Sequence, residues 1–363
     1  MSTSEDLAKA LAVAIGENDD PSTVKTFVDS GFAPLNFALS GKWGGGFPVG
    51  RIVELFGPSS AGKTALATYA MASAQRQKGL AFFQDHERSF QHPLAARIGL
   101  DLDRAFVFKK PRTFEESMNI VAKGSQAVRA RKLIPPEAPI VAVFDSLASM
   151  VPMSKLFDSK TGKEKSVEDF NMHDKMALPS ATSASFPAFN QICEELGICA
   201  IFLNQIRMKV GVMYGDPTTT PGGESPKFYA SIRIQLGATR LMDGKGPEAV
   251  MLGQEVKARI IKNKVYRPYL TATWQFLFQP DGTGRLHVAR SLIEFLAGLG
   301  VIEKAGNYLV WEGGKFYAKQ LAEKLDNPAG IAALHALLPV VHEPTIEVPP
   351  EASDVTTDVE AAA

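Results

Sequence analysis

Short apolar runs alternate with longer helix-forming stretches from about residue 33 to residue 280. Such runs predict buried strands, and helices between them carry the chain back so that successive strands lie parallel. The expected strands are residues 51–56, 80–84, 140–144, 198–203, 232–236, 256–261 and 273–277. The later strands follow one another without long helices, which favours an antiparallel far edge. We therefore expect an α/β fold with a mostly parallel twisted sheet and ligands at the carboxyl ends of its strands.

The pattern changes after Pro280, Asp281 and Gly282, a sequence typical of a turn. The elements expected beyond it are helices at 292–299, 318–325 and 329–338 and a small hairpin at 306–312. This mixture predicts a small α+β domain over residues 281–342, separate from a core at residues 33–280.

Both ends of the chain differ from these regions. Residues 3–15 place leucines and an isoleucine on one face of a short helix, so we assign residues 1–32 to packing between protomers, with packing on its own chain as the alternative. Residues 343–363 combine acidic side chains with prolines and contain no Lys or Arg. That composition predicts a disordered acidic tail, and both a solubilising and a regulatory role stay open.

The composition limits the classes of partner and site. Among 363 residues, Lys and Arg together number 39 and so do Asp and Glu, so a nucleic-acid partner needs a local basic surface. Cys193 and Cys199 lie in or beside apolar runs, which favours reduced thiols in the core and excludes a zinc site built on two cysteines alone. No run is long enough for a membrane span, so we expect a cytoplasmic protein without a membrane partner.

A glycine-rich motif carries the most specific chemistry. It runs Gly57, Pro58, Ser59, Ser60, Ala61, Gly62, Lys63, Thr64, between an apolar run and a helix-forming stretch. In this setting backbone N–H groups surround phosphates, and the new helix points its positive end at them. We expect Lys63 to reach the β- and γ-phosphates and the Thr64 hydroxyl to ligate Mg²⁺.

Two other expected strands end in acidic residues. Asp145 follows the run 140–144 and is expected to hold Mg²⁺ through water while Thr64 ligates it directly. Glu87 follows a strand that we expect beside the phosphate loop, where its carboxylate can orient and deprotonate an attacking water. A solvated loop carboxylate is the alternative for Glu87. His86 shows no partner in the sequence, and we interpret it as a neighbour rather than as the base.

Gln205 follows the expected strand 198–203, in the position of a γ-phosphate sensor. The loop after it mixes basic, glycine, threonine and apolar residues without periodicity. Such a loop supplies charge for phosphates and apolar side chains that can wedge between bases, with an ordinary surface loop as the alternative. Its candidate DNA-binding residues are Arg207, Met208, Lys209, Val210, Gly211, Gly222 and Gly223.

Several segments together carry a family resemblance. They are 50–64 (GRIVELFGPSSAGKT), 204–211 (NQIRMKVG), 227–233 (KFYASIR), 262–264 (KNK) and 299–307 (LGVIEKAGN). In this order they resemble the bacterial recombinase A (RecA) family of DNA strand-exchange ATPases, over about residues 33–338. Residues 34–41 are closer to phage-encoded relatives, so we expect a phage-encoded member that acts in a bacterial cell.

The resemblance implies a helical filament on single-stranded DNA that pairs with homologous double-stranded DNA, with ATP and Mg²⁺ at the interface between protomers. It assigns catalysis to Lys63, Glu87 and Gln205. By the same resemblance, the nucleotide contacts also include Lys262 and Lys264 from the neighbouring protomer, Lys227 belongs to the DNA-binding residues, and Phe228 transmits the ATP signal between subunits. A solvated edge strand is the alternative for the two lysines. Single-strand-binding and mediator proteins are candidate further partners.

The chain also departs from the family pattern. Leu94 stands where the family usually has an aromatic residue that stacks on adenine, and the first DNA-binding loop, residues 154–185, is longer than usual. Two other functions share the same nucleotide motif. A hexameric RecA-fold helicase would unwind forked duplexes, and a DNA-binding filament scaffold would bind ATP without hydrolysing it.

Overall fold

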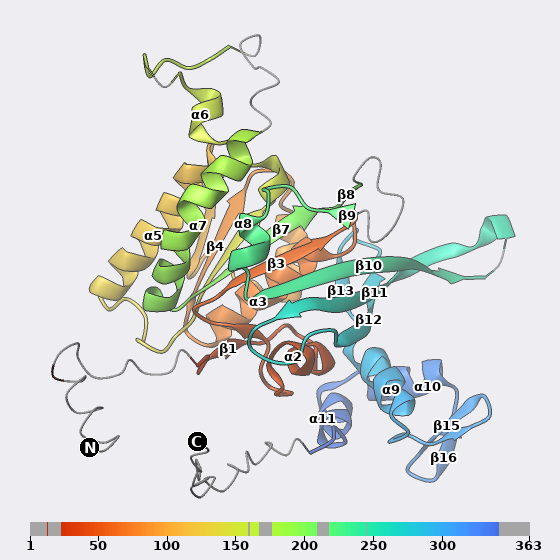
Figure 1. The fold of residues 1–363 in the computed structure, drawn as a ribbon. Helices are drawn as coiled ribbons and strands as arrows, with labels where there is room; N and C mark the ends of the chain where they lie inside the picture. Colours follow the sequence, from red (N-terminus) through yellow and green to blue (C-terminus); the bar gives the residue numbers. More distant parts are fainter. Residues whose placement is uncertain are drawn as a thin grey trace, which may run out of the picture.

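The computed structural model describes residues 23–158, 160–166, 176–208, 218–244 and 246–340, together with Val13. Within these residues a nine-stranded sheet has the order β13-β12-β11-β10-β3-β7-β6-β4-β5 (Figure 1). Its strands are β3 Ile52–Gly57, β4 Leu80–Asp85, β5 Phe106–Lys109, β6 Ile140–Asp145, β7 Ile198–Gln205, β10 Ile232–Asp243, β11 Val250–Asn263, β12 Thr271–Phe278 and β13 Gly284–Leu286. The predicted N-terminal helix and acidic tail lie outside the described residues.

The sheet combines a parallel and an antiparallel part. Every neighbouring pair from β10 to β5 is parallel, whereas β10, β11, β12 and β13 pair antiparallel. This confirms the expected mostly parallel α/β sheet with an antiparallel far edge. β10 and β11 extend well beyond the predicted runs, because their distal halves pair with each other and are largely exposed, so burial does not impose a long apolar pattern on them.

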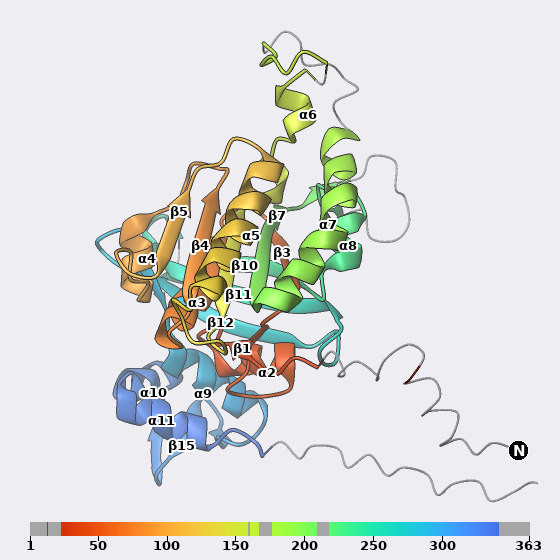
Figure 2. The same ribbon diagram turned by 90° about the vertical axis from the view of Figure 1, so that its left-hand side faces the viewer.

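Helices cover both faces of the sheet (Figure 2). Alternate strand residues point to opposite faces, so Val141 and Val143 of β6 pack in the core that contains α3 Lys63–Arg76, while Ile140 and Phe144 pack in the core that contains α5 Phe114–Ala130 and α7 Ala177–Leu196. Continuous burial on both faces explains the unbroken apolar runs of the central strands. Cys193 and Cys199 are buried and free, as predicted.

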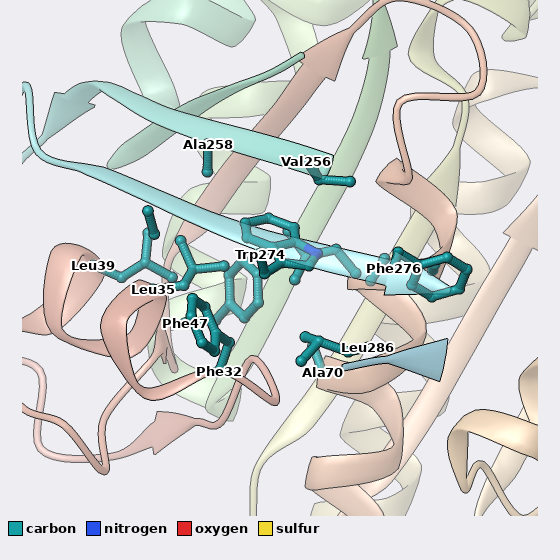
Figure 3. Close-up of a cluster of buried hydrophobic side chains, with 14 of the residues drawn as sticks. Phe32, Leu35, Leu39, Phe47, Ala70, Val256, Ala258, Trp274, Phe276 and Leu286 are labelled. Atoms are coloured by element: carbon teal, nitrogen blue, oxygen red, sulfur yellow. The ribbon is translucent and has the colours of Figure 1, made fainter. Parts of the chain in front are cut away.

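A third group of side chains attaches the start of the described chain to the antiparallel edge. Phe32 and Leu35, at and within α2 Ala33–Ser40, lie with Phe47 against Trp274 of β12 (Figure 3). The Phe32 and Trp274 ring centroids are 6.1 Å apart. The other short elements before residue 250 are β1 Phe27–Val28, β2 Phe47–Pro48, α4 His92–Ile98, η1 Leu147–Ser149, α6 Met153–Leu156, β8 Arg207–Met208, β9 Thr218–Thr219, α8 Ser225–Tyr229 and η4 Gly246–Glu248.

The elements after the main sheet are α9 Val288–Gly298, β14 Lys304–Ala305, β15 Tyr308–Trp311, β16 Gly314–Phe316, α10 Ala318–Leu325 and α11 Pro328–Ala336. The expected helices are therefore present, and the expected hairpin is part of a three-stranded antiparallel sheet. Leu292 and Leu296 of α9 are fully buried and belong to the same core cluster as the main sheet. Among the described residues, no helix combines the length and apolar character needed to cross a membrane.

One prediction about strand neighbours is wrong. The strand that precedes Glu87, β4, does not lie beside β3, because β7 and β6 both lie between them. Chain order does not determine this arrangement, since β3 takes its neighbours β7 and β10 from much later in the sequence. The side chain of Glu87 therefore does not approach the phosphate loop from a strand next to β3.

Candidate nucleotide and DNA site

The loop from Gly57 to Thr64 joins β3 to the first turn of α3. Gly57 has no space for a side chain, since a Cβ there would lie 2.4 Å from the Leu236 carbonyl oxygen, and Gly62 has a φ of 85° in the left-handed region. Lys63 Nζ donates to the carbonyl oxygens of Gly57 at 3.1 Å and Pro58 at 2.7 Å. The loop residues between the two glycines thus form a turn beneath an ammonium group.

Thr64 and Asp145 meet at the ends of two strand–helix connections. Thr64 Oγ1 donates to Asp145 Oδ2 over 2.9 Å, although the residues lie 81 positions apart. Burial raises the pKa of Asp145 to about 6, and the Thr64 hydrogen bond opposes that rise. Burial likewise lowers the pKa of Lys63, against the pull of the Asp145 and Glu87 carboxylates. A hydroxyl and a carboxylate side by side are oxygen ligands that suit Mg²⁺.

The loop after β4 brings Glu87 to this site. The N–H groups of His86 and Glu87 both donate to the carbonyl oxygen of Asp145, at 2.7 and 3.1 Å, so the loop after β4 passes over the end of β6. Glu87 Oε1 then accepts hydrogen bonds from Ser146 Oγ and from Gln205 Nε2, the latter at 2.9 Å. Three strand ends therefore converge on one carboxylate. Ser146 is a contributor that the sequence analysis missed, and its position directly after Asp145 was the available signal.

His86 has a partner that the sequence does not reveal. Its Nε2 lies 3.1 Å from Ser117 Oγ, and Ser117 donates its own proton to the Phe114 carbonyl, so His86 Nε2 is the donor of the pair. Burial, assisted by the charge of Arg88, lowers the pKa of His86 to about 4. A neutral imidazole that donates to α5 has a structural role, which leaves Glu87 as the candidate base.

The converging side chains line a cavity of about 380 Å³. The sequence analysis did not anticipate the wall contributed by the antiparallel edge, which consists of Gln254, Phe276, Phe278, Gly282, Thr283 and Gly284. Leu94 also lines the cavity, together with Gln91. A larger hollow of about 1210 Å³ lies elsewhere, between Trp43, Tyr266 and His335, but none of the motif residues lines it. The smaller cavity is the candidate site, because the ammonium, hydroxyl and carboxylates meet there.

Asn204 and its neighbours connect the phosphate-loop strand to the next loop. The Asn204 side chain donates to Glu54 Oε1 at 2.9 Å and to the Pro221 carbonyl at 3.0 Å. Glu54, which is 1% exposed, forms an ion pair with Arg233 at 2.6 Å. Local sequence does not indicate this buried charge pair, because Glu54 lies within an apolar run and Arg233, its cross-strand partner on the neighbouring β10, is distant in the sequence.

The candidate DNA-binding residues are only partly described. Arg207 and Met208 form β8, which pairs with β9, whereas Lys209, Val210 and Gly211 lie outside the described residues. Gly222 and Gly223 have φ values of 98° and 77° at the end of the same loop. Lys227 follows in α8, where its ammonium is 2.6 Å from the Glu224 carboxylate.

Lys262 and Lys264 lie away from the phosphate loop of their own chain. Neither lines the cavity; Lys262 Nζ donates to the carbonyl oxygens of Lys227 at 2.8 Å and Phe228 at 2.7 Å. Burial lowers the pKa of Lys262 to about 8, with further contributions from Lys264 and Arg233. Lys264 Nζ lies 5.5 Å from the ring centroid of Phe228, which is 66% exposed. These residues form a separate basic and aromatic surface.

Three comparisons relate this chain to known proteins. Residues 3–283 match the family model described as the RecA N-terminal domain. The chain is 32% identical over 312 residues to Protein RecA of Streptococcus equi subsp. zooepidemicus (strain MGCS10565), covering 86% of this chain and 75% of that protein. The same figures hold for Protein RecA of Streptococcus pyogenes serotype M1. A crystal structure of the RadB recombinase covers 70% of this chain and 98% of its own, with 18% identity and a TM-score of 0.45.

Proposed function

The chain belongs to the RecA family, and we propose on that premise that it is an ATP-dependent recombination protein. It forms helical filaments on single-stranded DNA and pairs that strand with a homologous duplex. The observation that carries the proposal is the convergence of Thr64, Asp145, Glu87 and Gln205 on one cavity next to the Lys63 loop. Such a set of groups is what ATP hydrolysis linked to a neighbouring loop requires.

The residues present suit ATP and Mg²⁺ as cofactors. The loop has a glycine without space for a side chain, a left-handed glycine and a new helix N-terminus, which together present backbone N–H groups to phosphates. Bound ATP with Mg²⁺ supplies the phosphoryl group and neutralises the charge that develops during its transfer. Thr64 and Asp145 would hold the metal, and Lys63 would turn from its carbonyl partners towards the phosphates.

Glu87 then acts on the attacking water. Its carboxylate accepts a proton from that water, and the donors Ser146 and Gln205 keep one of its oxygens in a fixed orientation. Gln205 also begins the loop that leads to the DNA-binding residues, so a change at the γ-phosphate position alters the start of that loop. This is the proposed link between hydrolysis and DNA affinity.

DNA and protomer contacts complete the proposal. Arg207, Lys209 and Lys227 contact DNA phosphates, the apolar and glycine residues of the same loop contact bases, and specificity comes from base pairing. Lys262 and Lys264 act on the ATP of a second copy, and Phe228 lies at that interface. The proposed organisation is a packing segment at residues 1–32, a core at 33–280, a small domain at 281–342 and a tail at 343–363. A phage source and a role with single-strand-binding or mediator proteins stay predictions.

The decisive experiment measures ATP hydrolysis with and without single-stranded DNA while the same samples are imaged by electron microscopy. We expect DNA-stimulated hydrolysis with helical filaments for the wild type, loss of hydrolysis in Lys63→Ala, and filaments without hydrolysis in Glu87→Gln. Lys123→Ala is a matched control, because this lysine is exposed on α5. Closed rings that unwind a forked duplex would indicate a helicase, and wild-type filaments without turnover would indicate a scaffold.

A further inference from the structure

The turn at residues 221–223 ends the second expected DNA-binding loop, and it is held from two sides. On one side Thr182 Oγ1 lies 2.8 Å from the Gly222 carbonyl oxygen and 2.9 Å from the Pro179 carbonyl oxygen of its own helix, so its one proton is shared between these two acceptors. Thr182 is fully buried in α7, whose first turns lie within the first expected DNA-binding loop, residues 154–185. On the other side the Asn204 side chain donates to the Pro221 carbonyl at 3.0 Å. The turn therefore has side-chain contacts to two elements that arrive from different parts of the site.

The packing around this turn leaves little room for independent movement. A Cβ on Gly222 would lie 2.9 Å from Leu147, and one on Gly223 would lie 3.0 Å from Pro179, so both glycines are in direct contact with their surroundings. Their φ values of 98° and 77° lie in a region of backbone conformation that residues other than glycine rarely adopt, so the shape of this turn favours glycine at both positions. Leu147 follows Asp145 by two positions, so the turn also touches the segment that continues from the metal-binding carboxylate.

Asn204 is fixed on the nucleotide side. Its two amide hydrogens are both used, one by Glu54 on the phosphate-loop strand and one by Pro221, and its oxygen accepts from the backbone N–H of Gln205 at 3.0 Å. Asn204 is completely buried. A shift of the Gln205 backbone must therefore either move Asn204 with the turn or break hydrogen bonds of a buried amide, which is costly.

We propose that Thr182 and Asn204 are positioning residues that make the turn at residues 221–223 the coupling element between the nucleotide site and both expected DNA-binding loops. The inference rests on the proposed function, because it needs ATP and single-stranded DNA to bind the same molecule. Through this turn each ligand raises the affinity for the other, and linkage requires the two effects to be equal. Neither residue touches the reacting atoms.

The test compares the affinity for a fluorescent oligothymidylate with and without a non-hydrolysable ATP analogue and Mg²⁺. Coupling between sites commonly amounts to about 5- to 150-fold, and we expect a wild-type ratio of affinities in that range. Thr182→Val removes the hydroxyl donor and keeps nearly the same side-chain shape. We expect it to lower the ratio of the two DNA affinities about 5-fold or more, until that ratio approaches one. ATP hydrolysis without DNA, the KM for ATP and the thermal midpoint should stay close to wild type.

Two matched variants separate coupling from general damage. Thr182→Ser retains the hydroxyl and should restore the wild-type ratio, while Gln191→Ala changes an exposed residue of the same helix outside the expected DNA-binding loop and should leave the ratio unaltered. An unchanged ratio in Thr182→Val, or a loss that Thr182→Ser does not restore, overturns the inference. A wild-type ratio of one also overturns it, without contradicting the proposed function, which filaments and DNA-stimulated hydrolysis test separately.

A measurement on the wild type keeps the inference testable if Thr182→Val does not fold. Backbone hydrogen exchange at residues 220–225 should slow when the ATP analogue binds without DNA, and also when oligothymidylate binds without nucleotide. Exchange that responds to only one of the two ligands overturns the proposed coupling through this turn.

Discussion

Gln205 Nε2 donates a hydrogen bond to Glu87 Oε1 over 2.9 Å, although the two residues lie 118 positions apart in the chain. β4 and β7 are not neighbours in the sheet, so this contact depends on the loop after β4 crossing the end of β6. It joins the proposed base to the last residue of β7, directly before the segment that we propose contacts DNA. Its removal should therefore be measurable in the rate of hydrolysis.

Gln205→Ala is expected to lower DNA-stimulated ATP hydrolysis about 10-fold, a part of the about 10²- to 10⁴-fold that a positioned base contributes. The physical reason is that Glu87 loses one of the donors that orient its carboxylate. Steady-state hydrolysis at saturating DNA checks the prediction. Gln254→Ala is the control, because Gln254 lines the same cavity but no described hydrogen bond joins it to Glu87. An equal loss in both variants would show that the effect comes from the cavity in general.

Thr64→Val and Asp145→Asn are expected to raise the Mg²⁺ concentration needed for half-maximal hydrolysis. Thr64→Val removes the hydroxyl, and Asp145→Asn replaces the carboxylate with a neutral amide, at the two groups that lie 2.9 Å apart at the proposed metal position. Losses of metal affinity from altered metal-site partners are typically about 10- to 100-fold, and we expect an effect of that size. Titration of Mg²⁺ at fixed ATP measures it. Asp103→Asn, at an exposed carboxylate, should leave the titration unchanged, and a similar shift in that control would contradict the assignment.

Arg233→Met should destabilise the fold by about 3–5 kcal/mol, because it leaves the buried Glu54 carboxylate without its ion partner. Urea unfolding of the unliganded protein measures the change. The double variant Glu54→Gln/Arg233→Met removes the uncompensated charge while an amide oxygen can still accept from Asn204, so it should recover part of the loss. Equal stability of the single and double variants would contradict the role of the buried charge.

His287 should make the stability depend on pH. Burial lowers its pKa, the charge of Asp326 opposes that change, and the charges of Arg285 and Arg290 add to it. Its Nδ1 accepts the backbone N–H of Arg290 at 3.3 Å as the N-cap of α9. The unfolded chain binds this proton more tightly than the folded one, so the free energy of unfolding decreases as the pH falls below about 6.5.

His287→Asn keeps an N-cap acceptor and removes the titration. The free energy of unfolding of this variant should therefore decrease less than that of the wild type between neutral and mildly acidic pH. Denaturant unfolding at several pH values measures both curves. Parallel curves for the two proteins would show that His287 does not titrate differently in the folded state.

Binding to single-stranded DNA should weaken steeply with salt. If Arg207, Lys209 and Lys227 neutralise phosphates, the logarithm of the binding constant falls against the logarithm of salt concentration with a slope of about −0.7 per phosphate. Lys227→Ala should make that slope shallower by about 0.7, whereas Lys123→Ala should not change it. An affinity that does not respond to salt would exclude the electrostatic part of the proposal.

The sequence by itself determined the features that depend on local pattern. Apolar runs fixed the central strands because burial on both faces demands them, and the glycine motif fixed the phosphate loop because its backbone shape requires glycine at two positions. Asp145 could be predicted since a strand end after such a run places its side chain at the ligand edge. For the same reason, Gln205 could be predicted at the end of its strand.

Only the tertiary structure decided which of these strand ends lie close to one another. The order of strands depends on crossovers that local periodicity does not encode, so β4 was wrongly placed next to β3 and the wall from β12 was missed. The same reason explains three other features. They are the contact of Glu87 with Gln205, the buried ion pair of Glu54 and Arg233, and the hydrogen bonds that residues 221–223 receive from two different elements. Each joins residues that are distant in the chain, and the packing of the sheet and its helices brings them within hydrogen-bond distance.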